Sequence, residues 1–191
     1  MRKGVLGVES LNLRLQEALN PPDGIKREIG TANGILRSGD KVMQIKNNYD
    51  LEWNLTGNGR IATESGTGIY NGDIGTVLSV SADAAYVRFD DGREAAYKGE
   101  ALSELELAYA ITIHKSQGSE YNAVILPLLS GPKMLMNRNL LYTAITRARQ
   151  MVCIIGSPEI VEEMIKNERE EKRFTGLKKR LLEIKDMECI S

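Results

Sequence analysis

The sequence predicts an α/β fold in which a mainly parallel sheet carries a small all-β unit as an insertion. Three short apolar runs predict strands covered on both faces, namely Ala110 to Ile113, Ala123 to Leu128 and Met151 to Ile155. Asn137 to Arg149 has the spacing of an amphipathic helix, so this part reads as strand, turn, strand, helix and strand. The all-β unit is indicated by the alternation of apolar and polar residues in Ala85 to Phe89.

The first predicted element is a helix from Glu9 to Leu19, which Asn20-Pro21-Pro22 ends. Its apolar side is expected to consist of Leu11, Leu15, Ala18 and Leu19. Residues 23–40 read as a polar, glycine-rich connection, and Lys41 to Lys46 as a strand. Asn47 to Asn54 then leads into a predicted long mobile loop, because glycine recurs there too often for a helix or a central strand. These glycines are Gly57, Gly59, Gly66, Gly68 and Gly72.

The all-β unit is predicted over residues 73–107. Gly75 to Val80 and Ala85 to Phe89 read as strands, and Arg93 to Tyr97 as a strand that returns after a tight turn at Asp90-Asp91-Gly92. Beyond the α/β segment, Ser157 to Arg173 is predicted to be a helix that begins at Pro158. A second helix is expected from Leu177 onwards.

Composition is that of an ordinary globular protein, with 42% hydrophobic and 27% charged residues and a net charge of −1. Residues 108–155 differ, because five Lys or Arg residues there face a single Glu, which suits a polyanionic ligand. No apolar run approaches the ~20 residues of a membrane span. Cys153, Cys189 and a single histidine predict reduced thiols, no metal site and a cytoplasmic protein.

Polar groups cluster where the predicted strands and helix meet. Thr112 to Glu120 leaves a strand and turns at Gly118, and such a turn can aim backbone N–H groups at an anion. Glu120 offers a carboxylate to a sugar hydroxyl. Arg147 and Arg149 are expected to end the helix beside it, where a guanidinium can donate to a transferring phosphoryl group.

These segments resemble the motifs of superfamily 1 helicases. Thr-Ile-His-Lys-Ser-Gln-Gly-Ser-Glu-Tyr (112–121) resembles motif V, and Tyr-Thr-Ala-Ile-Thr-Arg-Ala-Arg (142–149) resembles motif VI. The combination is most similar to the RecD/TraA-like branch, as are Gly7 to Pro22, the stretch Gly39 to Asp50, and Asn-Gly-Asp-Ile-Gly at residues 71–75. The resemblance covers about residues 1–156.

The resemblance implies a second RecA-like domain with a P-loop NTPase-like parallel sheet, incomplete here, and an inserted SH3-like β-barrel. We expect residues 1–45 and 106–173 to form the RecA-like domain. Residues 46–105 would then hold the glycine-rich loop and the barrel, and residues 174–191 a helical tail.

By resemblance, Arg147 would act catalytically on the γ-phosphate from across an interdomain cleft. The alternative is an Arg that only favours the helix dipole, worth ~0.3–1 kcal/mol. The other expected nucleotide-binding residues are Gln117, Gly118, Glu120 and Arg149. The expected DNA-binding residues are Thr112, His114, Lys115, Ser116, Tyr86 and Arg88. For Tyr86 and Arg88 an outward-facing polar stripe is an equal alternative to stacking and charge contacts with single-stranded DNA.

We therefore expect the C-terminal motor half of an ATP-dependent DNA helicase that translocates along single-stranded DNA, 5′ to 3′, in repair or recombination. The sequence has no Gly-Lys dipeptide and so no Walker A loop. ATP and Mg²⁺ would be bound with a missing N-terminal RecA-like domain, and the chain alone would be inactive. Exonuclease subunits are further expected partners. The alternatives are a single-stranded DNA-binding module built on the barrel, and the helicase-like domain of a conjugative relaxase.

Overall fold

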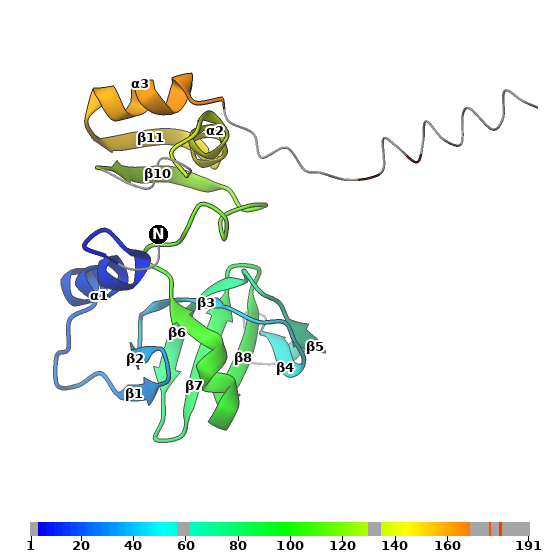
Figure 1. The fold of residues 1–191 in the computed structure, drawn as a ribbon. Helices are drawn as coiled ribbons and strands as arrows, with labels where there is room; N and C mark the ends of the chain where they lie inside the picture. Colours follow the sequence, from blue (N-terminus) through cyan, green and yellow to red (C-terminus); the bar gives the residue numbers. More distant parts are fainter. Residues whose placement is uncertain (1–3, 57–61, 130–134, 169–175, 177–179, 181–191) are drawn as a thin grey trace, which may run out of the picture. The chain divides into compact units, whose positions relative to one another are not determined.

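The computed structural model describes residues 4–56, 62–129, 135–168, 176 and 180, whose elements fall into two units (Figure 1). The first unit comprises residues 1–123 and 147–151, and the second comprises residues 124–146 and 152–191. The helical tail predicted for residues 174–191 lies outside the described residues, apart from Gly176 and Arg180.

The first unit is built on an antiparallel sheet of seven strands with the order β5-β4-β8-β7-β6-β3-β9. The strands are β3 (Lys41–Gln44), β4 (Asn48–Thr56), β5 (Ala62–Ile69), β6 (Ile74–Val80), β7 (Ala84–Phe89), β8 (Arg93–Lys98) and β9 (Leu105–Leu107). A 3₁₀ helix, η1 (Gly99–Glu104), connects β8 to β9. The predicted all-β unit is thus present, and β3, β4 and β5 belong to the same sheet.

Strand β7 shows why the alternation was informative. Ala85, Val87 and Phe89 are buried in the hydrophobic core, whereas Tyr86 and Arg88 are exposed on the other face. The turn to β8 closes with a hydrogen bond from the Gly92 amide to the Phe89 carbonyl at 2.9 Å. The pattern, the turn and the returning strand are all confirmed.

Two predicted loops are in fact hairpins. Within residues 23–40, β1 (Glu28–Thr31) pairs with β2 (Gly34–Arg37). The predicted mobile loop holds β4 and β5, and only Gly57 and Gly59 of its glycines lie outside the described residues. Gly66 is tolerated because β5 is at the sheet edge and the Trp53 ring fills the space of a side chain, 2.6 Å from where a Cβ would be.

Helix α1 (Val8–Leu19) forms where predicted, but its buried side is polar. Asn12, Gln16 and Asn20 are buried at a spacing of four residues, whereas Leu19 is 68% exposed. The Asn12 side chain donates to the carbonyls of Leu107 and Ala110, at 2.8 and 3.0 Å, and accepts from the Ala110 amide at 2.7 Å. The predicted apolar face is thus only partly confirmed: Leu11 and Leu15 are half-buried, Ala18 and Leu19 are exposed, and the buried positions of the helix are amides that form hydrogen bonds.

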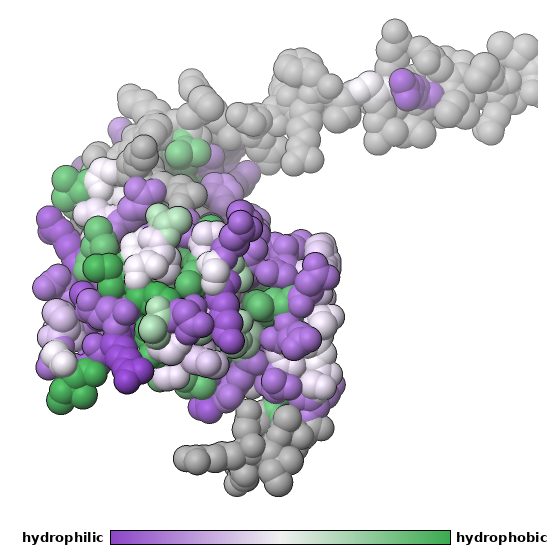
Figure 2. Space-filling view, turned by 90° about the horizontal axis from the view of Figure 1, so that it is seen from below, coloured by the Kyte–Doolittle hydropathy of each residue, from purple (hydrophilic) through white to green (hydrophobic). Residues whose placement is uncertain are grey.

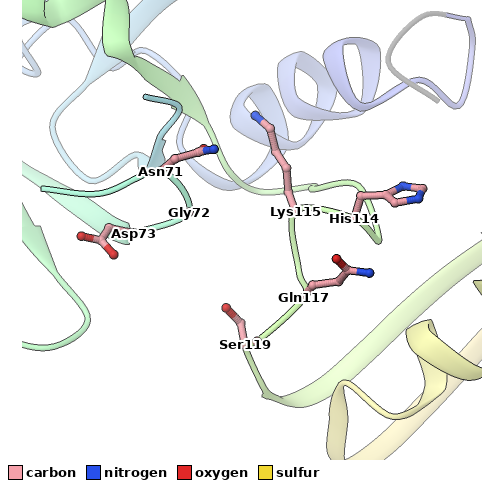
Figure 3. A pocket seen from close by; sticks show the side chains of 8 residues that line it. Asn71, Gly72, Asp73, His114, Lys115, Gln117 and Ser119 are labelled. Atoms are coloured by element: carbon pink, nitrogen blue, oxygen red, sulfur yellow. The ribbon is translucent and has the colours of Figure 1, made fainter. Parts of the chain in front are cut away.

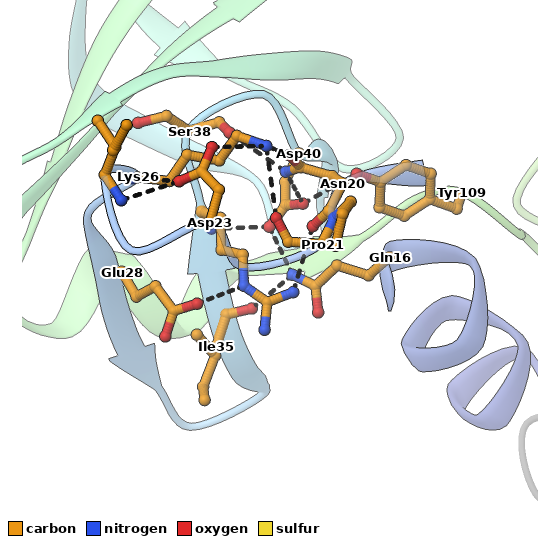
Figure 4. Close-up of polar contacts among 12 residues, drawn as sticks. Gln16, Asn20, Pro21, Asp23, Lys26, Glu28, Ile35, Ser38, Asp40 and Tyr109 are labelled. Atoms are coloured by element: carbon orange, nitrogen blue, oxygen red, sulfur yellow. Dashed lines mark hydrogen bonds and ion pairs between the residues drawn. The ribbon is translucent and has the colours of Figure 1, made fainter. Parts of the chain in front are cut away.

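The carboxylate of Asp40 is fully buried and collects donors from across the first unit (Figure 4). Its Oδ2 accepts from Gln16 Nε2 at 2.6 Å and from the Arg37 amide at 2.7 Å. Its Oδ1 accepts from Asn20 Nδ2 at 2.7 Å and from the Tyr109 hydroxyl at 2.8 Å. One side chain thus connects α1, the end of β2 and the segment after β9.

The other elements are β10 (Tyr121–Leu128), α2 (Arg138–Ile145), β11 (Ala148–Gly156) and α3 (Pro158–Lys166). Strands β10 and β11 form a two-stranded sheet. The Tyr121 amide donates to the Arg147 carbonyl at one end, and at the other end Gly156 lies against the Leu128 backbone, so the strands run parallel. Figure 1 shows α2 and α3 on one side of this pair.

Three predictions about this part are corrected. Residues 110–113 have irregular backbone instead of a strand. Strands β10 and β11 are not covered on both faces, since Ile125 is 64% exposed and Ile155 53%, as expected when helices cover only one side of a sheet. Helix α2 ends at Ile145, so neither Arg147 nor Arg149 is helical. The face shown in Figure 2 is mostly hydrophilic and shows hydrophobic residues only in small groups.

We expect Asp40→Ala to destabilise the first unit by at least about 3 kcal/mol, because it removes the acceptor of four hydrogen bonds, three of them buried. Urea denaturation of the chain would measure the loss. Asp50→Ala, which removes an exposed carboxylate, should cost less than about 0.5 kcal/mol. A loss below about 1 kcal/mol for Asp40→Ala would contradict the role given to this carboxylate.

Alkaline pH should weaken the same network through Tyr109. Burial, and next the hydrogen bond to Asp40, raises the pKa of Tyr109 to about 12, above the ~10 of an unfolded chain. The stability contributed by its neutral hydroxyl is therefore complete below pH ~10 and is lost as pH rises towards 12. The free energy of unfolding of the wild type should approach that of Tyr109→Phe over this range, and a constant difference would contradict the assignment.

Candidate functional site

Residues 112–119 form a compact turn that its own hydrogen bonds hold. The Ser116 amide donates to the Thr112 carbonyl at 3.1 Å, and the Ser119 amide to the Ser116 carbonyl at 3.1 Å. Gly118 has a φ of +85°, a left-handed conformation that other residues rarely adopt. The predicted turn at Gly118 is therefore present.

The predicted DNA-contacting residues of this turn differ in what their side chains do. Thr112 Oγ1 accepts from the Lys115 amide at 3.2 Å, and the buried Ser116 hydroxyl donates to the Ile113 carbonyl at 2.8 Å, so both shape the turn. Lys115 Nζ lies 3.0 Å from Glu106 Oε2. His114 is exposed.

A surface hollow of about 560 Å³ brings this turn together with the turn after β5 (Figure 3). The lining residues from the first turn are His114, Lys115, Gln117, Gly118 and Ser119. The lining residues from the second turn are Asn71, Gly72 and Asp73. Residues 71–73 belong to a segment that resembles the RecD/TraA-like branch, but they were not predicted to join the site.

The turn after β5 is as firmly held as the first. The Gly72 amide donates to the Gln44 carbonyl and the Gln44 amide to the Asp73 carbonyl, both at 2.9 Å. Asp73 Oδ2 also accepts from Arg93 Nη2 at 2.7 Å. The hollow therefore has two preformed walls, which expose backbone, amide, imidazole and ammonium groups.

The two predicted arginines meet the end of the 112–119 turn. Arg147 Nη1 donates to the Ser119 carbonyl at 3.3 Å, and its side chain is partly buried. Arg149 Nε lies 2.8 Å from Glu120 Oε2 in an exposed ion pair. Both arginines were predicted beside Glu120, and the chain places them there from the turn after α2 and from β11.

The aromatic and basic side chains of β7 and β8 separate into two groups. Tyr86 and Arg88 stand on the outer face of β7, and Arg88 forms an ion pair with Glu94 at 2.7 Å. Tyr97, in contrast, is fully buried and donates to Gln44 Oε1 at 2.8 Å. Arg93 is held by Asp73 and Asp91, so neither Tyr97 nor Arg93 presents a free surface to a ligand.

Two family descriptions match the chain. Residues 11–90 match the SH3 domain of ATP-dependent RecD-like DNA helicases, and residues 107–155 match the UvrD-like helicase C-terminal domain. The first match begins in α1 and ends after β7, and the second contains the 112–119 turn and both arginines. The resemblance stated from the sequence is confirmed.

Curated relatives extend the same likeness over nearly the whole chain. The ATP-dependent RecD2 DNA helicase of Deinococcus radiodurans is 37% identical over 95% of this chain and 22% of its own length. The RecBCD enzyme subunit RecD of Mycolicibacterium smegmatis is 40% identical over 63% of this chain and 21% of its own length. The chain thus spans about a fifth of these relatives.

Solved structures of the Bacteroides Pif1 helicase share the fold. One, in complex with ADP-AlF3 and ssDNA, aligns with a TM-score of 0.56 at 23% identity, covering 91% of this chain and 42% of that one. Another, bound to ssDNA, has a TM-score of 0.52 at 22% identity, covering 81% and 40%. Together with the SH3 match, this confirms the predicted fold class, an SH3-like domain joined to an incomplete RecA-like domain.

Gly118→Ala should destabilise the turn by about 1 kcal/mol, because alanine pays a steric penalty at positive φ although nothing lies within 4 Å of its Cβ. Gly118→Asn should lose less, since asparagine tolerates this conformation. Gly30→Ala, which also meets nothing within 4 Å but needs no positive φ, is the matched control. Equal effects of the Gly118→Ala and Gly30→Ala changes in urea denaturation would contradict the strain argument.

Proposed function

We propose that this chain, a RecD-like segment of the superfamily 1 helicases, forms the C-terminal motor part of an ATP-dependent DNA helicase. The observation that carries the proposal is the meeting of the two motif ends, where Arg147 contacts Ser119 and Arg149 contacts Glu120. Groups suited to a nucleotide thus converge at one place. The named relatives are an ATP-dependent DNA helicase and a subunit of the RecBCD enzyme, and the chain would supply about a fifth of such a protein.

In this proposal Arg147 is the catalytic residue. Its guanidinium would donate to the γ-phosphoryl oxygens as charge builds on them during transfer, which is electrostatic stabilisation from a preorganised donor. The bond to the Ser119 carbonyl holds the side chain in place before ATP arrives. Gln117, Gly118, Glu120 and Arg149 would contact the rest of the nucleotide, with Glu120 reaching the ribose.

We assign residues 112–116, the first part of the 112–119 turn, to the DNA backbone. His114 and Lys115 line the hollow and would contact phosphate directly, whereas Thr112 and Ser116 would act mainly by shaping the turn that presents them. On the barrel, Tyr86 and Arg88 are proposed to contact single-stranded DNA. A turn with nucleotide at one end and DNA at the other can couple the two ligands if it has two arrangements that each ligand stabilises differently.

The remaining parts of the helicase are proposed to lie outside this chain. Within the described residues no group of three or more His, Cys, Asp or Glu side chains can hold a metal ion, so the Mg²⁺ ligands are assigned to an N-terminal RecA-like domain. That domain and single-stranded DNA would be the main partners, with exonuclease subunits as further ones. The domain division near residues 45, 106 and 173 also stays a prediction.

We propose the cytoplasm as the location, where single-stranded DNA and ATP meet. None of the helices in the described part of the chain is long and apolar enough to cross a membrane.

Arg147→Ala should lower DNA-stimulated ATP hydrolysis by the longer polypeptide by about 10³–10⁵-fold, because the transition-state donor is lost. Arg147→Lys should recover little, since an ammonium lacks the planar fork of donors. A steady-state phosphate-release assay at saturating DNA measures both variants.

The control is Arg14→Ala, which removes an exposed arginine of α1 that this proposal does not use. It should leave hydrolysis unchanged, and DNA binding by Arg147→Ala should persist. Hydrolysis by Arg147→Ala within threefold of the wild type would remove the arginine-finger role. A parent without ATPase activity would overturn the motor proposal itself.

A further inference from the structure

Two tyrosines stand exposed side by side at one end of the barrel. Tyr49, near the start of β4, is 64% exposed, and Tyr70, directly after β5, is 45% exposed. Their ring centroids are 5.9 Å apart, and the rings meet edge to face at 72°. Exposed aromatic rings are common singly, but a fixed pair presents two flat faces to a ligand.

Several contacts hold the two rings in this arrangement. Asn47 Nδ2 donates to the Tyr49 hydroxyl at 3.2 Å, and Asn47 Oδ1 accepts from the Asn71 amide at 2.9 Å. The Tyr70 amide donates to Asp73 Oδ2 at 3.0 Å. Gly68 leaves space for the Tyr70 ring, because a Cβ there would lie 2.8 Å from the Tyr70 hydroxyl.

The pair is connected to the hollow described above through Asn71, which lines the hollow and whose amide donates to Asn47 Oδ1. Tyr70 is followed at once by Asn71, Gly72 and Asp73, which form one of its walls, and Lys115 lies in the other (Figure 3). Aromatic rings therefore stand close to a polar recess that offers amide groups and the Lys115 ammonium, which is paired with Glu106. The recess also contains the Asp73 carboxylate, which is held by Arg93. This is the combination that a nucleotide requires, with a base to stack and a phosphate to be hydrogen-bonded.

The surroundings argue against a protein-docking patch. Asn47, Asp50 and Asn71 are exposed beside the two rings, so the apolar surface is small and interrupted by polar groups. Protein interfaces need larger contiguous apolar surfaces than this. A nucleobase needs only one ring face, and stacking is worth about 1–3 kcal/mol per base.

We propose that Tyr49 and Tyr70 form a base-stacking subsite for single-stranded nucleic acid, whose adjoining phosphate enters the hollow beside Lys115. The subsite rests on the proposed DNA-binding function and adds Tyr49 and Tyr70 to the predicted DNA-binding residues. Because every base has a flat π face, the subsite binds without sequence preference.

Tyr49→Leu and Tyr70→Leu should each weaken binding of a fluorescein-labelled oligo(dT) by about 5- to 100-fold, as expected from the loss of one stacked base. Tyr49→Phe and Tyr70→Phe are the matched controls, since they keep the ring. They should bind within about twofold of the wild type. Fluorescence anisotropy of the full 191-residue chain measures all five proteins, and urea denaturation verifies that each is folded.

An abasic oligonucleotide provides a second test with the same backbone charge. The wild type should bind it more weakly than oligo(dT), and the difference should shrink in the Leu variants, because they have no ring for the base. Equal binding of the two oligonucleotides by the wild type, or Leu variants that match the Phe variants, would overturn the subsite.

The experiment distinguishes an incorrect subsite from an incorrect proposed function. If the wild type binds oligo(dT) and the Leu variants bind equally well, the subsite is wrong and the DNA-binding function stands. If the wild type binds neither oligonucleotide, both are overturned for this chain. In the longer polypeptide, Tyr70→Leu should raise the DNA concentration needed for half-maximal ATPase stimulation and leave the rate at saturating DNA unchanged.

Discussion

The buried carboxylate of Asp40, which has no contact with water, constrains the whole first unit. Burying a charge is costly unless hydrogen bonds replace its hydration, and Asp40 accepts four of them, all from neutral donors. These donors come from α1, from the end of β2 and from Tyr109. Each element must therefore keep its distance and angle to the others, since moving any of them would leave either the carboxylate or its own donor unsatisfied.

That constraint reaches the functional turn through α1. Gln16 and Asn20 bind Asp40, and Asn12, one turn earlier on the same face, binds both polar groups of the Ala110 backbone. Ala110 precedes the 112–119 turn by only two residues. The helix thus transmits the position of a buried carboxylate to the segment that lines the hollow. A helix attached through leucines would define this position less strictly, because apolar contacts have little directional preference.

The sequence predicted well wherever burial is apolar and local. Strand β7 follows its alternation residue by residue, and the Asp90-Asp91-Gly92 turn needed only its own residues. The prediction failed at α1, because the buried side chains that hold this helix are amides, and a hydropathy pattern assigns amides to the exposed face. The prediction failed again at β5, a strand that accommodates Gly66 at the sheet edge because the Trp53 ring from β4 covers this glycine. Both exceptions depend on partners that local patterns do not include.

The residues of the candidate site likewise fall into those that their own segment predicted and those that depend on distant parts of the chain. Gln117, Gly118 and Lys115 lie in the hollow and were named from the resemblance of their own segment. Asn71 to Asp73 and the tyrosine pair were not predicted, because they join the site only when β5 and β6 bring a turn some forty residues away to it. The resemblance of Asn-Gly-Asp-Ile-Gly to the RecD/TraA-like branch could have indicated that this turn belongs to the site, because it is a short polar turn between two strands of the barrel.

The ion pair between Glu120 and Arg149 is compatible with a nucleotide role for both residues. Its side chains are 54% and 63% exposed, and pairs this exposed are worth about 0–1 kcal/mol. A ribose hydroxyl and a phosphate can therefore replace the two partners at small cost. Arg147 differs, because its side chain is partly buried and Nη1 donates to the Ser119 carbonyl, so the 112–119 turn helps to fix its position before a phosphate arrives.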